Sequence, residues 1–414
     1  MFIDGALPGE LARVRVRGKR RSHLDAVLVE ILRQGPDRVD PPCPYFGTCG
    51  GCALQHLAHQ AQLEAKHQQL SDALRRIGKI TPEHWLTPIS GPIWEYRRKA
   101  RLGVRYVPKK GGVLVGFRER HKSYITPLKS CAALAPQVSK LLPTLPELIA
   151  GLSCYTRIPQ IEVAVGDNDV ALVLRHLEPL TDVDVAKIQD YARSHHIQML
   201  LQAEGPNSIV ACWPAVFREL YYTLPKHNIV ISFGPTDFVQ VNAKTNHALI
   251  DLALELLEPA KQERLLDLFC GLGNFTLPIA RYCNEVIGVE GDPELVQRAQ
   301  HNAEQNHLTN VKFIHADLYT ESGDLALPDA LLLRKPNKIL LDPPRSGAIE
   351  IIKKIPELAP QRIVYVSCNP ATLARDSELL VHKHRYRLTR AGIIDMFPNT
   401  AHVESIAVFE RTGT

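Results

Sequence analysis

DLFCGLGNFTLPIA, residues 267–280, joins an apolar strand to a helix through a glycine-rich turn. Gly271 and Gly273 have no β-carbon, so the backbone can bend sharply there and come close to a ligand. In open parallel sheets, cofactors bind outside the carboxyl ends of the strands. The G-x-G spacing is shorter than the full dinucleotide motif and, taken alone, also fits an ordinary turn. Because S-adenosylmethionine has no pyrophosphate to bind, the short form favours that cofactor, and Gly271 is a candidate contact.

The segments around this turn alternate between strand and helix from about residue 240 onward. This alternation predicts a doubly wound parallel sheet of the α/β class, and we assign residues 236–414 to a Rossmann-like, S-adenosylmethionine-dependent methyltransferase domain. The second strand ends at Glu290, where an acid about twenty residues past the turn can accept hydrogen bonds from ribose hydroxyls. The third strand ends near Asp317, which could accept from the adenine amino group.

Three regions precede this domain. Residues 1–40 have the pattern of short strands, and residues 41–92 hold a cysteine-rich stretch followed by a helix. Residues 93–235 are mostly strands with one helix-like segment at 182–195, so we predict a mainly antiparallel, β-rich domain that binds RNA. The basic tract at 15–21 has two interpretations: charges that protect an edge strand, or a surface that contacts RNA.

VYVSCNPATLARD, residues 364–376, places Cys368 just past a buried strand, where active sites form in such sheets. A thiolate adds readily to carbon 6 of a pyrimidine, which makes carbon 5 nucleophilic, and it can leave again afterwards. The polar, turn-rich setting disfavours the alternative of a buried structural cysteine. In LLDPPRSG, residues 340–347, Arg345 stands where amino-group methyltransferases carry an aromatic residue, which counts against methylation of a base amine.

Methylation at carbon 5 also needs a base to remove the carbon 5 proton. DMFPNTAHVESIAVFER, residues 395–411, supplies His402 and Glu404. Either residue could serve by its type.

The nine cysteines are unevenly distributed. Clustered cysteines in a chain of this size bind metal or do chemistry more often than they form disulfides, and we expect a reducing cytoplasm. Cys43, Cys49 and Cys52 have the spacing of three iron–sulfur ligands, with Cys131 as a distant fourth. Four thiolates suit a 4Fe-4S cluster. Zinc is the alternative for any four-cysteine site.

The bulk properties set outer limits on function. A length of 414 residues favours two or three domains, and 45% apolar with 22% charged residues is typical of a folded soluble protein. We expect no membrane span, no secretory leader and a monomer. A net charge of +5 is compatible with an RNA partner.

Four segments together resemble the motifs of the RNA uracil-5-methyltransferase family over nearly the whole chain: Ser367–Asp376, Asp395–Glu404, Asp267–Pro278 and Phe233–Asn242. The resemblance implies that Cys368 is the nucleophile, Glu404 the general base and Gln240 a residue of the active site. It also implies cofactor contacts at strand ends and turns, namely Phe269, Asn274, Glu290, Asp317 and Asp342.

CPYFGTCGGC, residues 43–52, looks like the ribosomal RNA branch of that family, because the transfer RNA branch lacks these cysteines. The larger ribosomal RNA enzymes carry an N-terminal TRAM domain, a small RNA-binding barrel, and residues 2–32 look like its second half. The resemblance thus implies a 4Fe-4S cluster and methylation of a flipped-out 23S rRNA uridine. The alternatives are another 23S uridine, a transfer RNA, or a non-catalytic iron–sulfur RNA-binding protein that needs neither Cys368 nor Glu404.

Overall fold

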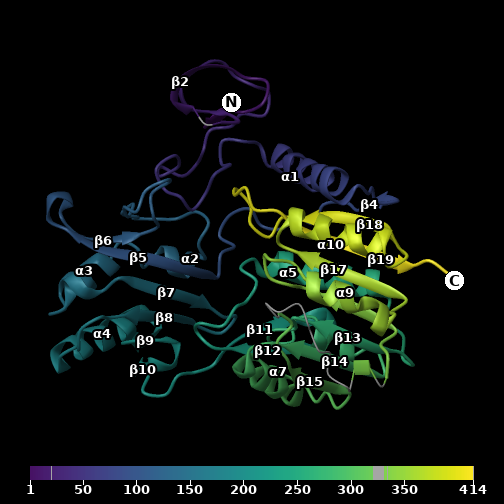
Figure 1. The fold of residues 1–414 in the computed structure, drawn as a ribbon. Coiled ribbons are helices and arrows are strands. Elements are labelled where there is room, and N and C mark those ends of the chain that lie inside the picture. The colour runs from purple at the N-terminus through teal and green to yellow at the C-terminus, as the bar shows by residue number, and fades with distance from the viewer. Residues whose placement is uncertain (20, 320–330, 333, 414) are drawn as a thin grey trace.

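A computed structural model describes residues 1–19, 21–319, 331–332 and 334–413. Figure 1 shows a small N-terminal sheet beside two larger bodies, one built on the central strands and one on the C-terminal half. The small sheet has the order β1-β3-β2 and consists of β1 (Phe2–Asp4), β2 (Leu11–Lys19) and β3 (Leu24–Arg33). Within these described residues, no helix is long and apolar enough to cross a membrane.

Residues 41–92 connect the small sheet to both larger bodies. They contain α1 (His59–Ala73), the π-helical turn η1 (Leu74–Gly78) and the short strand β4 (His84–Trp85). Strand β4 pairs in parallel with β18 of the C-terminal half, so this region also extends the sheet formed there. The cysteine-rich residues 43–52 lie in turns before α1.

The central body is a six-stranded sheet with the order β10-β9-β8-β7-β5-β6. All neighbours pair antiparallel except β8 and β9, which are parallel because a helix connects them. The elements are β5 (Lys99–Val107), η2 (Pro108–Lys110), β6 (Gly112–Gly116), α2 (Pro136–Ser139), α3 (Leu145–Ala150), η3 (Tyr155–Arg157), β7 (Gln160–Val165), β8 (Val170–Arg175), α4 (Asp182–His195), β9 (Gln198–Gln202), η4 (Pro206–Ser208) and β10 (Ile209–Trp213). The helix expected at 182–195 is present as α4, whereas the short helices α2 and α3 were not expected from the sequence.

The C-terminal half contains the predicted doubly wound sheet, with the order β15-β14-β13-β16-β17-β19-β18-β4. Strands β15 to β17 of this order are parallel, and β19 and β18 continue it antiparallel. The elements are α5 (Ala243–Leu257), β13 (Arg264–Leu268), α6 (Thr276–Ala280), β14 (Glu285–Glu290), α7 (Pro293–Gln305), β15 (Val311–His315), β16 (Lys338–Leu341), α9 (Ile349–Leu358), β17 (Arg362–Ser367), α10 (Pro370–His382), β18 (Tyr386–Ile394) and β19 (Glu404–Arg411). The strand order reverses between β13 and β16, which is where ligands bind in such sheets.

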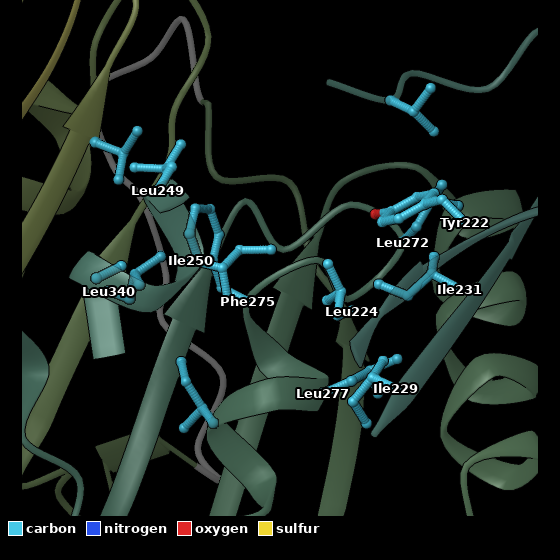
Figure 2. Close-up of a cluster of buried hydrophobic side chains, with 14 of the residues drawn as sticks. Tyr222, Leu224, Ile229, Ile231, Leu249, Ile250, Leu272, Phe275, Leu277 and Leu340 are labelled. Atoms are coloured by element: carbon cyan, nitrogen blue, oxygen red, sulfur yellow. The ribbon is translucent and has the colours of Figure 1, made fainter. Parts of the chain in front are cut away.

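A hairpin of β11 (Leu220–Leu224), the turn η5 (Pro225–His227) and β12 (Ile229–Phe233) lies within the range 93–235 that the sequence predicts to be one β-rich domain, but it is not part of the central sheet. The hairpin is a separate two-stranded sheet, and Figure 2 shows its apolar side chains in one cluster with those of α5 and the glycine turn. Asn302 of α7 and Asn306, which caps the end of that helix, bind the β12 backbone. The Asn302 side chain accepts from the N–H of Ser232 (2.9 Å), and the Asn306 side chain accepts from the N–H of Val230 (2.8 Å). These side chains satisfy the hairpin edge, a contact between distant residues that strand periodicity does not reveal.

Candidate active site and cysteine cavity

One cavity of about 500 Å³ lies at the carboxyl ends of the parallel strands. It is lined by all of the expected nucleophile, base and cofactor residues: Gln240, Phe269, Gly271, Asn274, Glu290, Asp317, Asp342, Cys368 and Glu404. These residues come from segments up to 164 residues apart (404 − 240), and most of them meet because they lie at the end of a strand of the sheet, at the start of one or in the glycine turn. Gln240 comes instead from the segment between β12 and α5. The geometry therefore brings a thiol, a carboxylate base and a nucleotide-type turn to one place.

The glycine turn is braced by the carboxylate of Glu290. Gly271 has a φ of +53°, a conformation that favours glycine, and its N–H donates to Glu290 Oε2 at 3.0 Å. Glu290 Oε1 accepts from the N–H of Gly291 (2.8 Å) and Asp292 (3.1 Å). The carboxylate is thus fixed in orientation at the cavity wall, with lone pairs left for the hydroxyls of a ribose.

Two residues of the expected cofactor set have additional partners. Asn274 Oδ1 accepts from the Tyr222 hydroxyl (2.8 Å) and from Asn246 Nδ2 (3.0 Å), while its Nδ2 donates to Asn246 Oδ1 (3.1 Å). Asn274 consequently links the hairpin to α5 as well as lining the cavity. Asp317 Oδ1 accepts from the Tyr319 N–H at 2.8 Å, which orients the carboxylate at the end of β15.

Cys368 directly follows β17 and precedes α10, whose first turn is capped by Asn369 through a bond from the Ala371 N–H. Burial raises the pKa of the Cys368 thiol to about 11, and the nearby carboxylates of Glu404 and Asp342 add to this rise. Arg345 acts in the opposite direction. In the ligand-free protein the thiol is therefore protonated at neutral pH, and added positive charge in the cavity would make it more acidic.

Glu404 is the first residue of β19, which pairs with β17, and it is only 6% exposed. Its Oε1 lies 3.4 Å from His402 Nε2. The other base candidate, His402, packs edge-on against Phe397 with ring centroids 4.7 Å apart. Both candidates line the cavity, and the more buried Glu404 begins the strand that pairs with β17, which Cys368 directly follows.

Two buried acids, Asp267 and Asp342, interact electrostatically with each other, and Asp342 lines the cavity. Burial raises the pKa of Asp267 to about 7, although Thr276 Oγ1 donates to it at 2.5 Å. Burial also raises the pKa of Asp342 well above its usual range, and the negative charges of Glu404 and Asp267 add to this rise. A cavity that holds this many carboxyl groups suits a ligand with a positive charge, such as a sulfonium.

Sequence reasoning did not single out several aromatic residues that line the cavity, namely Phe238, Phe397 and Tyr319. Phe238 stands two residues before Gln240 and is 71% exposed at the mouth. The Tyr319 ring lies 5.5 Å from that of Phe269, centroid to centroid. An aromatic residue two positions after the strand-end acid Asp317 is the available sequence signal for Tyr319, while the exposure of Phe238 follows from tertiary structure alone.

The four clustered cysteines line a second cavity, whose water-accessible volume is about 60 Å³. Burial raises the pKa of the Cys52 thiol to about 11 and also raises the pKa of Cys49 and Cys131, and neighbouring cysteines add to each rise. The Gly51 N–H donates to Cys49 Sγ at 3.4 Å. Thiolates held this close need compensating positive charge, which a metal group supplies.

Among the described side chains, no three or more histidine, cysteine, aspartate or glutamate residues have the arrangement of a ready ligand set for a metal ion. The thiols do share one cavity, and all four are free of disulfide bonds. Four thiols in one cavity are a donor set that suits an iron–sulfur group and equally suits a zinc ion.

Comparison with known proteins places the chain in a family. The profile of the tRNA (Uracil-5-)-methyltransferase family matches residues 58–412. Curated relatives include 23S rRNA (uracil(1939)-C(5))-methyltransferase RlmD of Thiobacillus denitrificans, 51% identical over 412 residues, covering 99% of this chain and 94% of that protein. The protein of the same name from Alkalilimnicola ehrlichii is 49% identical over 411 residues, covering 99% of this chain and 92% of that protein.

A solved structure adds evidence on the fold. Pyrococcus abyssi tRNA (uracil-54, C5)-methyltransferase in complex with S-adenosyl-L-homocysteine superposes with a TM-score of 0.73 at 24% sequence identity. The superposition covers 98% of this chain and 94% of that one. The identity of about half of all residues over nearly the whole chain, together with the family profile, shows that this protein belongs to the tRNA (Uracil-5-)-methyltransferase family.

Proposed function

We propose that this protein transfers a methyl group from S-adenosylmethionine to carbon 5 of a uridine in 23S rRNA. The observation that carries the proposal is the single cavity in which Cys368, Glu404 and the braced glycine turn meet. The choice of 23S rRNA rests on relatives of about 50% identity that are named for uracil 1939 of that RNA. Such an enzyme works in the cytoplasm, where ribosomal RNA is made and used.

The reaction begins with the thiol. The sulfonium of the methyl donor brings positive charge into a cavity rich in carboxyl groups, which lowers the pKa of Cys368 from its high ligand-free value. The thiolate adds to carbon 6, and the electron pair of the carbon 5–carbon 6 double bond attacks the methyl group. A carbon–carbon bond forms at carbon 5, the sulfur–methyl bond breaks, and S-adenosylhomocysteine leaves.

The second half of the reaction belongs to Glu404. Its carboxylate takes the proton from carbon 5, the electron pair of that bond restores the double bond, and the carbon 6–sulfur bond breaks. The products are 5-methyluridine and the free Cys368 thiolate. Gln240, whose Oε1 is buried at the cavity without a hydrogen-bond partner in the described structure, is available to accept from a donor on the base.

The target uridine must leave its stack to reach Cys368. Phe238 is exposed at the mouth of the cavity and can stack on a base during this movement. Stacking of a base on an aromatic ring does not depend on which base it is. On the small N-terminal sheet, Arg15 and Arg17 are exposed on β2, which lies at the edge of that sheet. Their charge suits phosphate contacts in the same encounter.

We also propose that Cys43, Cys49, Cys52 and Cys131 bind a 4Fe-4S cluster. When bound, such a cluster would fix the fold of the turns around 43–52, and methyl transfer itself requires no electron transfer. The four thiols would provide its ligands. The support is the shared cavity and the donor type, with zinc as the competing occupant.

RNA in which the target is 5-fluorouridine tests the chemistry. Fluorine at carbon 5 cannot be removed as a proton, so the enzyme should remain bound to the RNA as an adduct resistant to denaturant. Cys368→Ala should abolish the adduct, whereas Cys283→Ala, a buried cysteine outside the cavity, should retain it. Absence of an adduct with the wild type would refute the mechanism and favour a non-catalytic RNA-binding role.

Mapping 5-methyluridine in cells with and without the gene tests the substrate. We expect one 23S rRNA position to lose its methyl group. Loss at a transfer RNA position, or at a different 23S uridine, would refute the choice of substrate while leaving the chemistry in place.

A further inference from the structure

Asn399 lies five residues before Glu404, and its polar groups bind chain segments that are far away in sequence. Its carbonyl accepts from the backbone N–H of Ala53 (2.8 Å) and Leu54 (2.9 Å). Its Nδ2 donates to the Ile93 carbonyl at 3.0 Å. Asn399 is only 3% exposed, so bulk water does not replace a bond that is lost there.

A reciprocal pair of hydrogen bonds joins Asn399 to Gln62 of α1. Gln62 Nε2 donates to Asn399 Oδ1 (3.1 Å), and the Asn399 N–H donates to Gln62 Oε1 (2.9 Å). Gln62 is 2% exposed, and its Nε2 also lies near the carbonyls of Leu57 (2.8 Å) and Leu54 (3.0 Å). The pair therefore ties the loop before Glu404 to the segment that directly follows Cys52.

The rest of this loop is attached to the same part of the chain. Lys66 Nζ donates to the Phe397 carbonyl (3.0 Å) and to Asp395 Oδ1 (2.5 Å), and the Tyr96 hydroxyl donates to the Pro398 carbonyl (3.1 Å). Residues 395–399 thus take their conformation from α1 and the residues around it. They are not held only by the sheet that carries Glu404.

The backbone at Asn399 is in the left-handed region, with a φ of +64°. Asparagine tolerates this conformation better than most residues, but here it also needs partners for every buried polar group. The loop then runs through His402 to Glu404 in the cavity. A general base works only within hydrogen-bond reach of its proton, and a misplacement of about 1 Å can cost about 10²-fold in rate.

We propose that Gln62 and Asn399 are positioning residues for Glu404, acting through the loop and touching neither RNA nor methyl donor. This inference rests on the proposed function. It predicts an effect on only half of the reaction, because Cys368 addition and methyl transfer precede removal of the carbon 5 proton. With Glu404 displaced, the carbon 5 proton stays in place, the carbon 6–sulfur bond cannot break, and the methylated adduct persists.

The experiment follows one turnover of the full chain, as purified, on a 23S rRNA transcript with S-adenosylmethionine. Denaturing gels measure the protein–RNA adduct, and nucleoside analysis measures free 5-methyluridine. For Gln62→Leu we expect adduct formation at the wild-type rate and adduct breakdown slower by about 10²-fold. Asn399→Gly, which keeps the left-handed backbone but removes the side chain, should show the same separation of the two steps.

Two further variants distinguish positioning from loss of structure. Gln62→Glu retains an acceptor for the Asn399 N–H but places an oxygen against the three acceptors that Nε2 serves, so it should slow breakdown as Gln62→Leu does while adduct formation keeps the wild-type rate. Gln69→Leu, on an exposed position of the same helix, should behave as the wild type. Equal losses in adduct formation and breakdown, or unchanged breakdown in Gln62→Leu and Asn399→Gly, would overturn the inference. Failure of the proposed function has a different outcome, since the wild type itself would then form neither the adduct nor 5-methyluridine.

Discussion

Alkylation of Cys368 by iodoacetamide should be slow in the ligand-free enzyme and should rise only at strongly alkaline pH. The thiol has a pKa of about 11 because it is buried and faces Glu404 and Asp342. At pH 8 this pKa leaves roughly 10⁻³ of the thiol ionised, against roughly a quarter for an ordinary cysteine. A more basic thiolate is intrinsically more nucleophilic, which raises the alkylation rate by about tenfold. The net alkylation rate of Cys368 should therefore be about 20-fold lower than that of an ordinary cysteine.

Glu404→Gln provides a sharper test because it should raise the rate of Cys368 alkylation and lower the rate of catalytic turnover. Removing the carboxylate charge lowers the pKa of Cys368, so its alkylation at pH 8 should accelerate by a few-fold. Turnover should fall by about 10²–10⁴-fold because the base is lost. The assay is peptide mass spectrometry of Cys368 after timed alkylation between pH 7 and 11. An apparent pKa of 8.5 or below in the wild type, or slower alkylation in Glu404→Gln, would refute the reasoning.

Four other predictions concern separate parts of the molecule. Lys66→Met should lower the free energy of unfolding by at most about 3–5 kcal/mol in urea titrations, because it leaves the buried Asp395 with His59 as its one remaining described charge partner. Glu290→Gln should weaken binding of S-adenosylhomocysteine by roughly tenfold or more in calorimetry, because charged acceptors contribute about 1.5–3 kcal/mol. Phe238→Ala should weaken RNA binding by about 1–3 kcal/mol in filter assays while leaving calorimetric cofactor affinity unchanged. Cys49→Ala should remove the visible absorbance and the bound iron of the purified protein, and zinc without absorbance in the wild type would contradict the cluster.

The Lys66 prediction has a defined dependence on pH. Burial raises the pKa of Asp395, but His59 and Lys66 outweigh burial and leave it lowered. Its stabilising contribution is therefore present above the ordinary carboxylate range and is lost as the pH falls through the lowered value. The difference in unfolding free energy between Lys66→Met and the wild type should shrink there. Lys140→Met, at an exposed site, should change stability little at any pH, and a comparable loss there would point away from the buried pair.

The sequence allowed the sheet and the content of the active site to be predicted because both depend on local signals. A glycine turn follows β13, acids follow β14 and β15, and Cys368 follows β17, so the parallel sheet necessarily brings them to one edge. The hairpin β11–β12 was placed incorrectly because its partner is α7, about 70 residues later, and alternation of apolar residues does not reveal which core a strand faces.

The contacts of Asn399 and Gln62 could not be predicted for a related reason. They join residues 337 apart, and neither residue type nor spacing indicates a partner at that distance. The additional bonds of Asn274 to Tyr222 and Asn246 are equally non-local. The residues proposed to do the chemistry carried recognisable motifs, whereas the residues proposed to position them did not.

The short strand β4 has a consequence for how this protein is made. His84 and Trp85 pair with Arg390 and Ala391 of β18, and the N–H of Leu86 donates to the Ala391 carbonyl at 2.8 Å. Strand β4, which covers the edge strand β18, is therefore synthesised 306 residues (390 − 84) before it. During synthesis, β4 has no strand to pair with until β18 leaves the ribosome. A fragment that begins after β4 leaves β18 as an unpaired edge strand, which can pair with other chains and cause aggregation. Expression of the catalytic half should accordingly include residues 84–89 to stay in solution.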